Sequence, residues 1–237
     1  KVQKDALLNA LTTFDDAIKA DEKNGQAYAW KACALGQGLF RGYLEEDFNT
    51  VWKQAEDNLK KARELNENDF EVHRLMSEVS LAMKDFRAAQ RHSKICYEQV
   101  PNDPRVLSVY GEVCLRTGKV DEGLDAVKLA LEIDPVAQGK TNADPRHAAV
   151  IFGYYMARDK EGCLEQINNL EEIDFKSWLL TTKICRDEEH EFSNLDWFQE
   201  GKKLFSDKDF EKEVQDFRLN NDSATETLIS FAKELFS

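Results

Sequence analysis

The sequence predicts an all-α chain built as a solenoid of paired helices, and three observations carry this prediction. Its 237 residues include only 4 prolines and 11 glycines, so the residues that punctuate strands and turns are scarce. Lys, Glu, Leu and Ala, which favour helices, are abundant. Apolar helical patterns recur along the chain, and Pro101 and Pro135 each close one of them.

The composition and charge narrow the class of protein. A hydrophobic fraction of 42% beside a charged fraction of 32% is typical of a globular chain. The formal net charge of -13 argues against nucleic-acid binding, because phosphates are bound by concentrated basic faces. The charge suits a solvated acidic surface or a partner with basic patches. No apolar run approaches the roughly 18 residues of a membrane-spanning helix, so we expect no membrane insertion.

The five cysteines are odd in number and widely spaced, with no C-x-x-C pair: Cys33, Cys96, Cys114, Cys163 and Cys185. Neither a disulfide framework nor a zinc site fits this spacing, so we expect reduced thiols and a cytoplasmic setting. The chain begins at Lys1 rather than Met, and its first residues already have a helical pattern. We therefore expect an excised piece of a longer protein or a mature chain.

The two clearest repeats cover residues 70–103 and 104–137, a spacing of about 34 residues that is typical of a helix-turn-helix repeat. In the first repeat, Ala89 and Cys96 supply the small residues of the second helix. In the next repeat, the positions where the two helices should approach closely hold Gly111, Gly118, Gly123 and Ala130. Asp103 and Asp144 each precede a proline, so we expect both to be helix N-caps.

This spacing resembles the tetratricopeptide repeat (TPR), and the resemblance implies a right-handed superhelix of helix pairs over residues 1–177. Weaker copies fall at 1–24 (partial), at 25–69 with an insertion around "GLFRGYLEEDF", and at 144–177 after the short insertion "VAQGKTNA". The residues at the matching positions of these copies are Ala10, Phe14, Ala17, Tyr28, Ala55, Leu59, Ala62, Cys163, Ile167 and Leu170.

Residues 178–237 lose the repeat register but keep a helical pattern, and we expect a helical cap that closes the solenoid. Ser193 and Ser206 each precede an Asp by three residues, as in a capping box. One amphipathic stripe comprises Leu228, Ile229, Phe231, Ala232 and Leu235. This stripe either packs within the cap or docks on another domain.

No motif in the chain carries recognisable chemistry, so we expect no enzyme, no cofactor and no metal. The stretch "GQGLFRG" (36–42) follows a helical pattern rather than a strand, so its glycines are interpreted as a helix end rather than a phosphate loop. His73 and His147 are expected to pack between helices, and His92, among polar residues, to be solvated. His190 lies between acidic residues without converging ligands. Cys96, Cys114 and Cys163 are interpreted as small core residues.

The candidate site is the concave face of the solenoid, lined by the first helix of each pair. The residues expected on this face are Glu71, Arg74, Glu78, Arg105, Ser108, Glu112, Arg116, Phe152 and Tyr155. They suit an extended peptide or a helix from a protein partner, and the alternative is that they are simply solvated helix faces. Glu78 and Glu112 stand where TPR proteins that bind chaperone tails place amides, so an acidic tail is not the expected ligand.

The order of segments has a second resemblance. A repeat ending in "AIKADEKNGQAYAWKA", then an aromatic insertion, and finally the tail "FEKEVQDFR" are similar to the C-terminal TPR region of bacterial class III adenylate/guanylate cyclases and related regulators. The resemblance implies a sensory or assembly module with catalysis in an upstream domain. Two alternatives stay open: a peptide or small-ligand receptor with a site near the 36–48 insertion, and an unrecognised enzyme. A homo-oligomer also stays open.

Overall fold

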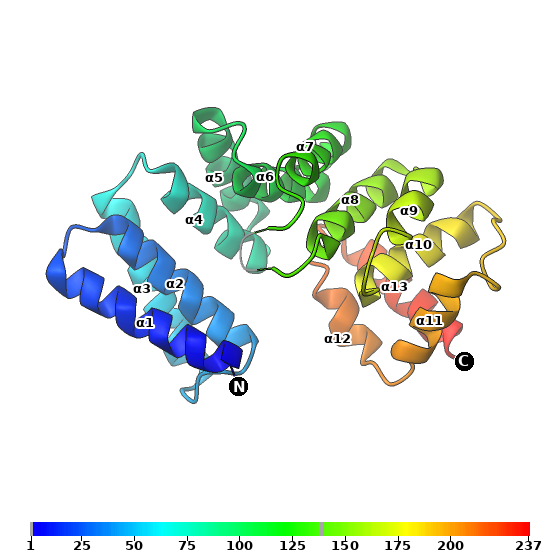
Figure 1. Cartoon of the computed structure of the whole chain (residues 1–237), viewed down its shortest axis with the longest axis horizontal. Helices are drawn as coiled ribbons and strands as arrows, with labels where there is room; N and C mark the ends of the chain where they lie inside the picture. The colour runs from blue at the N-terminus through cyan, green and yellow to red at the C-terminus, as the bar shows by residue number, and fades with distance from the viewer. Residues whose placement is uncertain (1, 138–139) are drawn as a thin grey trace. The chain divides into compact units, whose positions relative to one another are not determined.

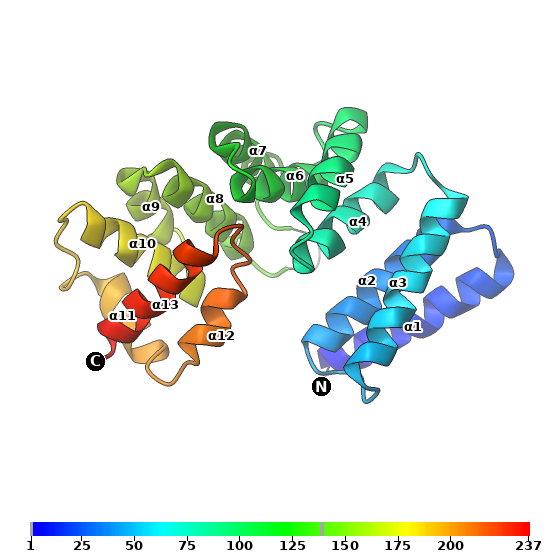
Figure 2. The ribbon, with the colours of Figure 1, turned by 180° about the vertical axis from the view of Figure 1, so that it is seen from behind.

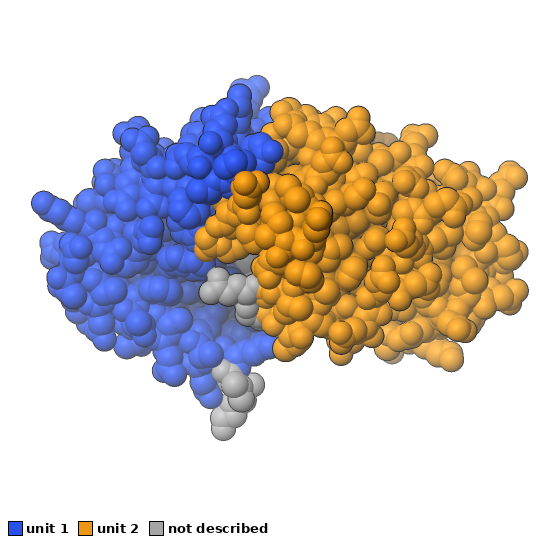
Figure 3. Space-filling model, turned by 45° about the horizontal axis from the view of Figure 1, so that its top comes forward, with its two compact units in different colours: residues 1–101 blue, residues 102–237 orange. Residues whose placement is uncertain are grey.

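The computed structural model describes residues 2–137 and 140–237, and within these residues it contains thirteen α-helices and no strand (Figure 1). The prediction of an all-α chain is confirmed. The chain divides into two compact units, Lys1–Pro101 and Asn102–Ser237, which are coloured separately in Figure 3. No helix in the described ranges is long and apolar enough to cross a membrane.

Unit 1 consists of five helices, α1 to α5. Their bounds are α1 (Val2–Ala20), α2 (Gly25–Phe40), α3 (Phe48–Leu65), α4 (Phe70–Ala82) and α5 (Phe86–Gln99). Helices α1, α2 and α3 lie side by side, with α2 packed against both neighbours, and α4 pairs with α5 (Figures 1 and 2). Ala55, Leu59 and Ala62 recur at helical spacing along α3 and are all buried, so the amphipathic pattern produces the packed face as predicted.

Unit 2 consists of eight helices in its described part. Their bounds are α6 (Pro104–Arg116), α7 (Val120–Ile133), α8 (Asp144–Ala157), α9 (Lys160–Ile167), α10 (Phe175–Asp187), α11 (Asp196–Leu204), α12 (Phe210–Gln215) and α13 (Asp222–Leu235). Trp178 of α10 lies at the centre of the core and is fully buried. Its indole Nε1 donates to the carbonyl oxygen of Phe198 at 3.2 Å, so the one polar atom of this ring is satisfied.

Each expected full repeat contains one pair of helices. The pairs are α2 and α3 within 25–69, α4 and α5 within 70–103, α6 and α7 within 104–137, and α8 and α9 within 144–177. The expected boundary at residue 177 falls inside α10, which begins at Phe175. Leu170 was expected in the second helix of its repeat, but α9 ends at Ile167, so Leu170 packs from the following loop. The "VAQGKTNA" insertion includes residues 138 and 139, which lie outside the described residues.

The small residues of the repeat at 104–137 have two different structural roles: some lie at a close helix contact and one lies in a turn. A Cβ on Gly111 would lie 2.8 Å from the carbonyl oxygen of Gly123, so both glycines are needed where α6 and α7 touch backbone to backbone. Ala130 is fully buried on the same helix pair. Gly118 does not mark a close approach, because nothing lies near its Cβ position. It adopts φ +87 in the turn between the helices, which L-residues rarely adopt.

Aspartate and asparagine side chains begin most of these helices. Asp103 accepts a hydrogen bond from the backbone N–H of Arg105 at the start of α6, as predicted. Asp144 does not cap α8; its carboxylate instead accepts the backbone N–H groups of Glu171 and Glu172, beyond α9. Ser193 and Ser206 do not cap either: α11 lacks a side-chain cap, and Asp209 caps α12.

The predicted amphipathic stripe of α13 is buried inside unit 2. Leu228, Ile229, Phe231, Ala232 and Leu235 all belong to its core, and α13 lies along α10 (Figures 1 and 2). Docking on another domain is therefore not needed to cover these side chains.

Candidate functional site

The candidate site consists of the first-helix faces, meaning the faces of α4 in unit 1 and of α6, α8 and α10 in unit 2. The sequence placed nine partner-binding residues on these helices, and the structure shows how many of them are open to a partner.

In unit 1, Arg74 is the centre of a buried ion network. Its Nη2 donates to Glu71 Oε1 at 2.7 Å, and its Nη1 donates to Glu78 Oε1 at 2.5 Å. Its guanidinium lies 5.4 Å from the centroid of the Trp30 ring. Burial opposes the charge of Arg74, but the hydrogen bond to Glu71 and the charge of Glu78 outweigh burial and raise its pKa.

This network corrects the expected role of two residues. Glu71 and Arg74 are 4% and 5% exposed, so they bind each other in the interior rather than a partner. The glutamate lies one turn before the arginine on the same helix, and that short spacing favours pairing within α4. Of the three expected residues on α4, Glu78 is the one near the surface, with a side chain that is 40% exposed.

In unit 2, Arg105 and Ser108 are held by local bonds. Arg105 Nη2 donates to Asp103 Oδ2 at 2.6 Å, and Ser108 Oγ donates to the Pro104 carbonyl at 3.0 Å. Ser108 also accepts a hydrogen bond from Arg146. Arg146 is buried and was not identified from the sequence. Because its Nε donates to the Asp134 carbonyl at 3.1 Å, it ties α6, the end of α7 and α8 together.

Arg116, at the end of α6, is the centre of a second polar cluster. Its Nη1 pairs with Glu112 Oε2 at 2.5 Å. Its Nε and Nη2 both donate to the main-chain carbonyl oxygen of Phe217, at 3.2 and 3.1 Å. Its guanidinium lies 4.6 Å from the centroid of the Phe152 ring. Arg116 thus contacts three residues of unit 2, namely Glu112, Phe217 and Phe152.

Lys176 of α10 completes this cluster, and it was not identified from the sequence. Its Nζ lies 4.0 Å from the centroid of the Phe152 ring, on the helix that follows α8 and α9. Burial and the charge of Arg116 lower the pKa of Lys176 to about 8, against the opposing charge of Glu112. Burial alone would raise the pKa of Glu112, but the charges of Arg116 and Lys176 hold it below its usual range.

Phe152 is fully buried, so the expectation that it lies on an open partner-binding face is wrong. It lies beneath the two cations, and the chain around Phe217 covers this region. Tyr155 is half-buried, and burial raises the pKa of its hydroxyl to about 12. These two aromatic side chains therefore do not form an exposed pair.

Most of the histidines and cysteines lie in the protein interior. His92 was expected at the surface, but it is 4% exposed and stacks on the buried His73, with ring centroids 5.1 Å apart. His147 is half-buried and bonds Gln166 through Nδ1 at 2.7 Å. All five cysteines are free thiols, and burial raises the pKa of Cys96 to about 12. Within the described ranges, no three His, Cys, Asp or Glu side chains converge as metal ligands.

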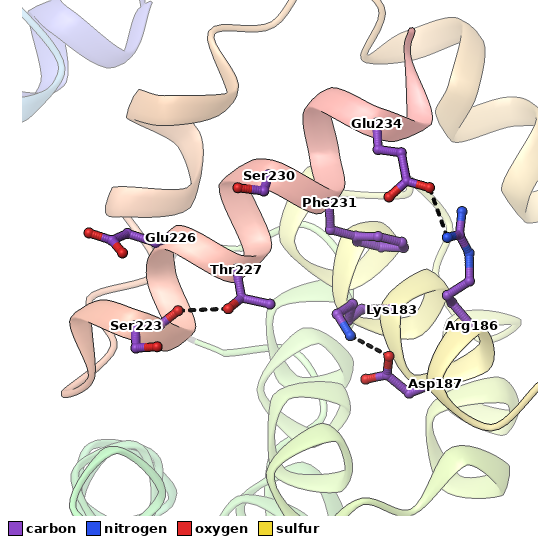
Figure 4. A pocket seen from close by; sticks show the side chains of 9 residues that line it. All are labelled: Lys183, Arg186, Asp187, Ser223, Glu226, Thr227, Ser230, Phe231 and Glu234. Carbon is purple, nitrogen blue, oxygen red and sulfur yellow. Dashed lines mark hydrogen bonds and ion pairs between the residues drawn. The ribbon is translucent and has the colours of Figure 1, made fainter.

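A shallow hollow of about 550 Å³ lies between α10 and α13 (Figure 4). Lys183 pairs with Asp187, and Arg186 pairs with Glu234 at 2.9 Å. Both cations lie over the ring of Phe231, at 5.5 and 5.4 Å from its centroid. The hollow is therefore a groove lined by ion pairs rather than an enclosed ligand cavity.

Comparison with solved structures places the fold among TPR proteins. The structure of PilF from Pseudomonas aeruginosa is similar over 92% of this chain and 91% of its own, with 15% identity and a TM-score of 0.61. A tetratricopeptide repeat protein from Parabacteroides merdae is similar over 97% of this chain and 78% of its own, with 13% identity and a TM-score of 0.55. At these identities the likeness shows a shared TPR-like helical repeat fold.

No protein-family model matches the chain, and no curated protein sequence matches it.

Proposed function

We propose that this chain is a non-catalytic scaffold whose first-helix faces bind a protein or peptide partner. One observation carries the proposal: in unit 2 the face formed by α6, α8 and α10 already holds a non-helical segment of main chain. Arg116 donates two N–H groups to the carbonyl oxygen of Phe217, in the turn that ends α12, so this face is able to bind main-chain carbonyl groups. The TPR-like fold supports this proposal, because stacked helix pairs present long binding surfaces.

The finer part of the proposal concerns the parent protein. We infer that the chain is the cytoplasmic regulatory or sensory module of a larger bacterial signalling protein, similar to the class III cyclases. The order of segments in the sequence supports this inference, and the reduced thiols agree with a cytoplasmic setting. Sequencing the parent gene tests it directly. A nucleotidyl-cyclase or response-regulator domain before Lys1 is the expected result, and a start codon next to Lys1 would contradict it.

Site-specific photocrosslinking in cells of the source organism tests the scaffold function. A photoreactive phenylalanine analogue would replace Glu78 of α4 or Arg105 of α6, both on first-helix faces. The matched control is Glu132, an exposed residue of the second helix α7. We expect a discrete crosslinked partner from Glu78 or Arg105 and none from Glu132. Equal crosslinking at all three positions, or none at any, would contradict the proposal.

One observation favours the second candidate, a receptor with a site near the 36–48 insertion. Phe48 is 56% exposed, and its ring stacks on that of Trp52 with centroids 6.0 Å apart. This aromatic pair follows the acidic run Glu45–Asp47, so it could hold a basic or aromatic group. Replacing Phe48 and Trp52 with alanine should abolish partner binding under this alternative and leave it unchanged under the first.

A further inference from the structure

We propose that the aromatic pair at the start of α3, Phe48 and Trp52, binds an arginine side chain in a basic segment of a partner protein. This inference rests on the second candidate function, the receptor near the 36–48 insertion, and names the ligand of that receptor. The aromatic pair belongs to the second helix of its repeat, so it is a different surface from the first-helix faces.

The two rings of the aromatic pair form a flat apolar surface that solvent reaches. Phe48 is 56% exposed and Trp52 is half-buried, and their ring planes are 9° from parallel with centroids 6.0 Å apart. The indole Nε1 of Trp52 donates to Glu56 Oε1 at 2.9 Å, which fixes the orientation of the indole ring. A planar ligand group can therefore lie over rings that already have a set geometry.

The faces of aromatic rings attract cations, and tryptophan attracts them most strongly. Unit 1 contains one example in its interior, where the guanidinium of Arg74 lies 5.4 Å from the centroid of the Trp30 ring. Among the residues that the structure describes, no arginine or lysine lies over Phe48 or Trp52. A cation for the aromatic pair would therefore come from another molecule.

The charges around the aromatic pair also favour a cation. Residues 43–56 contain one lysine and four acidic residues, which are Glu45, Glu46, Asp47 and Glu56. All four acidic residues are exposed. Charge complementarity therefore selects a basic segment, and the same charges would repel an acidic peptide or an anionic membrane surface.

Glu45 is the carboxylate that a ligand can use most easily. It lies three residues before Phe48, and its side chain is 95% exposed. Its ion pair with Lys4 is 3.8 Å long, and an exposed ion pair of this kind is weak enough to be exchanged for another cation. Asp47 is less free because it accepts the backbone N–H of Thr50 as the N-cap of α3. Its charge offsets the partial positive charge of the helix N-terminus, which would otherwise oppose a cation.

A guanidinium suits this surface better than an ammonium does. The guanidinium is planar, so one face can stack on an aromatic ring while its edge donates N–H groups to a carboxylate. An ammonium is compact and strongly hydrated, so it gains less from a flat ring. The arginine of the partner therefore stacks on the aromatic pair and donates to Glu45, and the remaining acidic residues attract the basic residues beside it.

The test is a titration followed by fluorescence anisotropy, with the labelled peptides GRGRGRG and GKGKGKG, which carry the same charge. The full chain is titrated as wild type and as Phe48→Leu, which keeps an apolar side chain at an exposed position but removes the ring. The wild type should bind the arginine peptide about fivefold more tightly than the lysine peptide. Phe48→Leu should bind the two peptides equally, because only their charge then contributes.

A second pair of variants tests the role of the carboxylate. Glu45→Gln should weaken the binding of both peptides about threefold. The matched control is Glu64→Gln, the same change at an exposed position of α3 that lies sixteen residues beyond Phe48, about 24 Å along the helix. The control should bind both peptides as the wild type does.

The outcomes separate this inference from the proposed function. Equal binding of the two peptides by the wild type, or no binding of either, would overturn the arginine ligand. A preference for arginine that persists in Phe48→Leu would overturn the role of the aromatic pair. If the peptides fail but crosslinking at Arg105 still captures a partner, the scaffold function stands without this ligand. If the peptides fail but alanine at Phe48 and Trp52 abolishes partner binding, the receptor stands with a ligand other than arginine.

Discussion

The imidazole rings of His73 and His92 stack inside unit 1 with their Nδ1 atoms 2.8 Å apart. The direction of this hydrogen bond follows from its neighbours. His73 Nε2 lies 2.7 Å from the carbonyl oxygen of Glu67, which can only accept, so this nitrogen carries the proton. In the neutral pair His73 Nδ1 then accepts and His92 Nδ1 donates. Arg91 Nη2, 3.4 Å from His92 Nε2, donates to the remaining acceptor.

This chain of hydrogen bonds predicts that unit 1 loses stability in mild acid. Burial, the neighbouring His73 and the charge of Arg91 together lower the pKa of His92 to about 4. Between its ordinary value of about 6.5 and this lowered pKa, the unfolded state binds more protons than the folded state, so stability falls as the pH drops. The slope should approach about 1.4 kcal/mol per pH unit.

Hydrogen exchange of the α4 and α5 amides, measured from pH 7 to pH 4.5 and corrected for intrinsic rates, checks this prediction. His92→Gln keeps an N–H donor but removes the titrating group. The opening free energy of this variant should depend less on pH than that of the wild type. Parallel pH profiles for the two chains would mean that His92 does not titrate in this range.

The helix contact at Gly111 predicts an overpacking effect. Gly111→Leu would drive a side chain into Val127 and the Gly123 carbonyl, so we expect a loss of about 1–3 kcal/mol or more. Gly36 in α2 is the matched control because nothing lies near its Cβ position. Gly36→Ala should instead stabilise the chain by about 0.5–1 kcal/mol. Urea denaturation followed by circular dichroism measures both, and a neutral Gly111→Leu would show that α6 and α7 do not touch there.

The buried cluster around Arg116 predicts a large loss on truncation. Arg116→Met leaves the Glu112 carboxylate and the Phe217 carbonyl without their donor, which should cost about 3–5 kcal/mol. The control is Lys94→Met, which breaks an exposed ion pair with Glu98 and should change stability by less than about 1 kcal/mol. Denaturation midpoints in urea compare the two. Similar small losses would mean that Arg116 is solvated rather than engaged with unit 2.

The helix patterns could be predicted from the sequence because their causes are local. Ala55, Leu59 and Ala62 lie at helical spacing, and that spacing alone places them on one face. Burial that is set by distant residues could not be predicted in the same way. His92 has polar neighbours in the sequence, yet its surroundings are decided by His73, 19 residues earlier.

Burial in the candidate site was also set by residues distant in the sequence and could not be predicted. Arg116 and Phe152 were placed on the correct helices, but the chain that covers them lies far along the sequence, at a separation of 101 residues between Arg116 and Phe217. Gly118 and Gly111 belong to the same repeat, and only the backbone angle distinguishes a turn glycine from a contact glycine.

Two adjacent threonines of α10 give the last prediction. Thr181 and Thr182 are both fully buried, but only Thr182 has a partner for its hydroxyl: its Oγ1 donates to the Trp178 carbonyl at 2.7 Å. Thr181 Oγ1 has no hydrogen-bond partner among the described residues. A buried hydroxyl without a partner carries its full desolvation cost, so Thr181→Val should stabilise the chain by about 1 kcal/mol or more.

Thr182→Val is the matched control, with the same change of shape at the next position of the same helix. It removes the hydrogen bond from the Thr182 hydroxyl to the Trp178 carbonyl, so stability should be unchanged or should fall by about 1 kcal/mol. Thermal unfolding of the two variants beside the wild type measures the difference. The changes in side-chain volume and helix propensity are the same at the two positions. The sign of the difference in stability therefore reports the hydrogen bonding of the two hydroxyls. If Thr181→Val is no more stable than Thr182→Val, the Thr181 hydroxyl must have found a partner, such as a buried water.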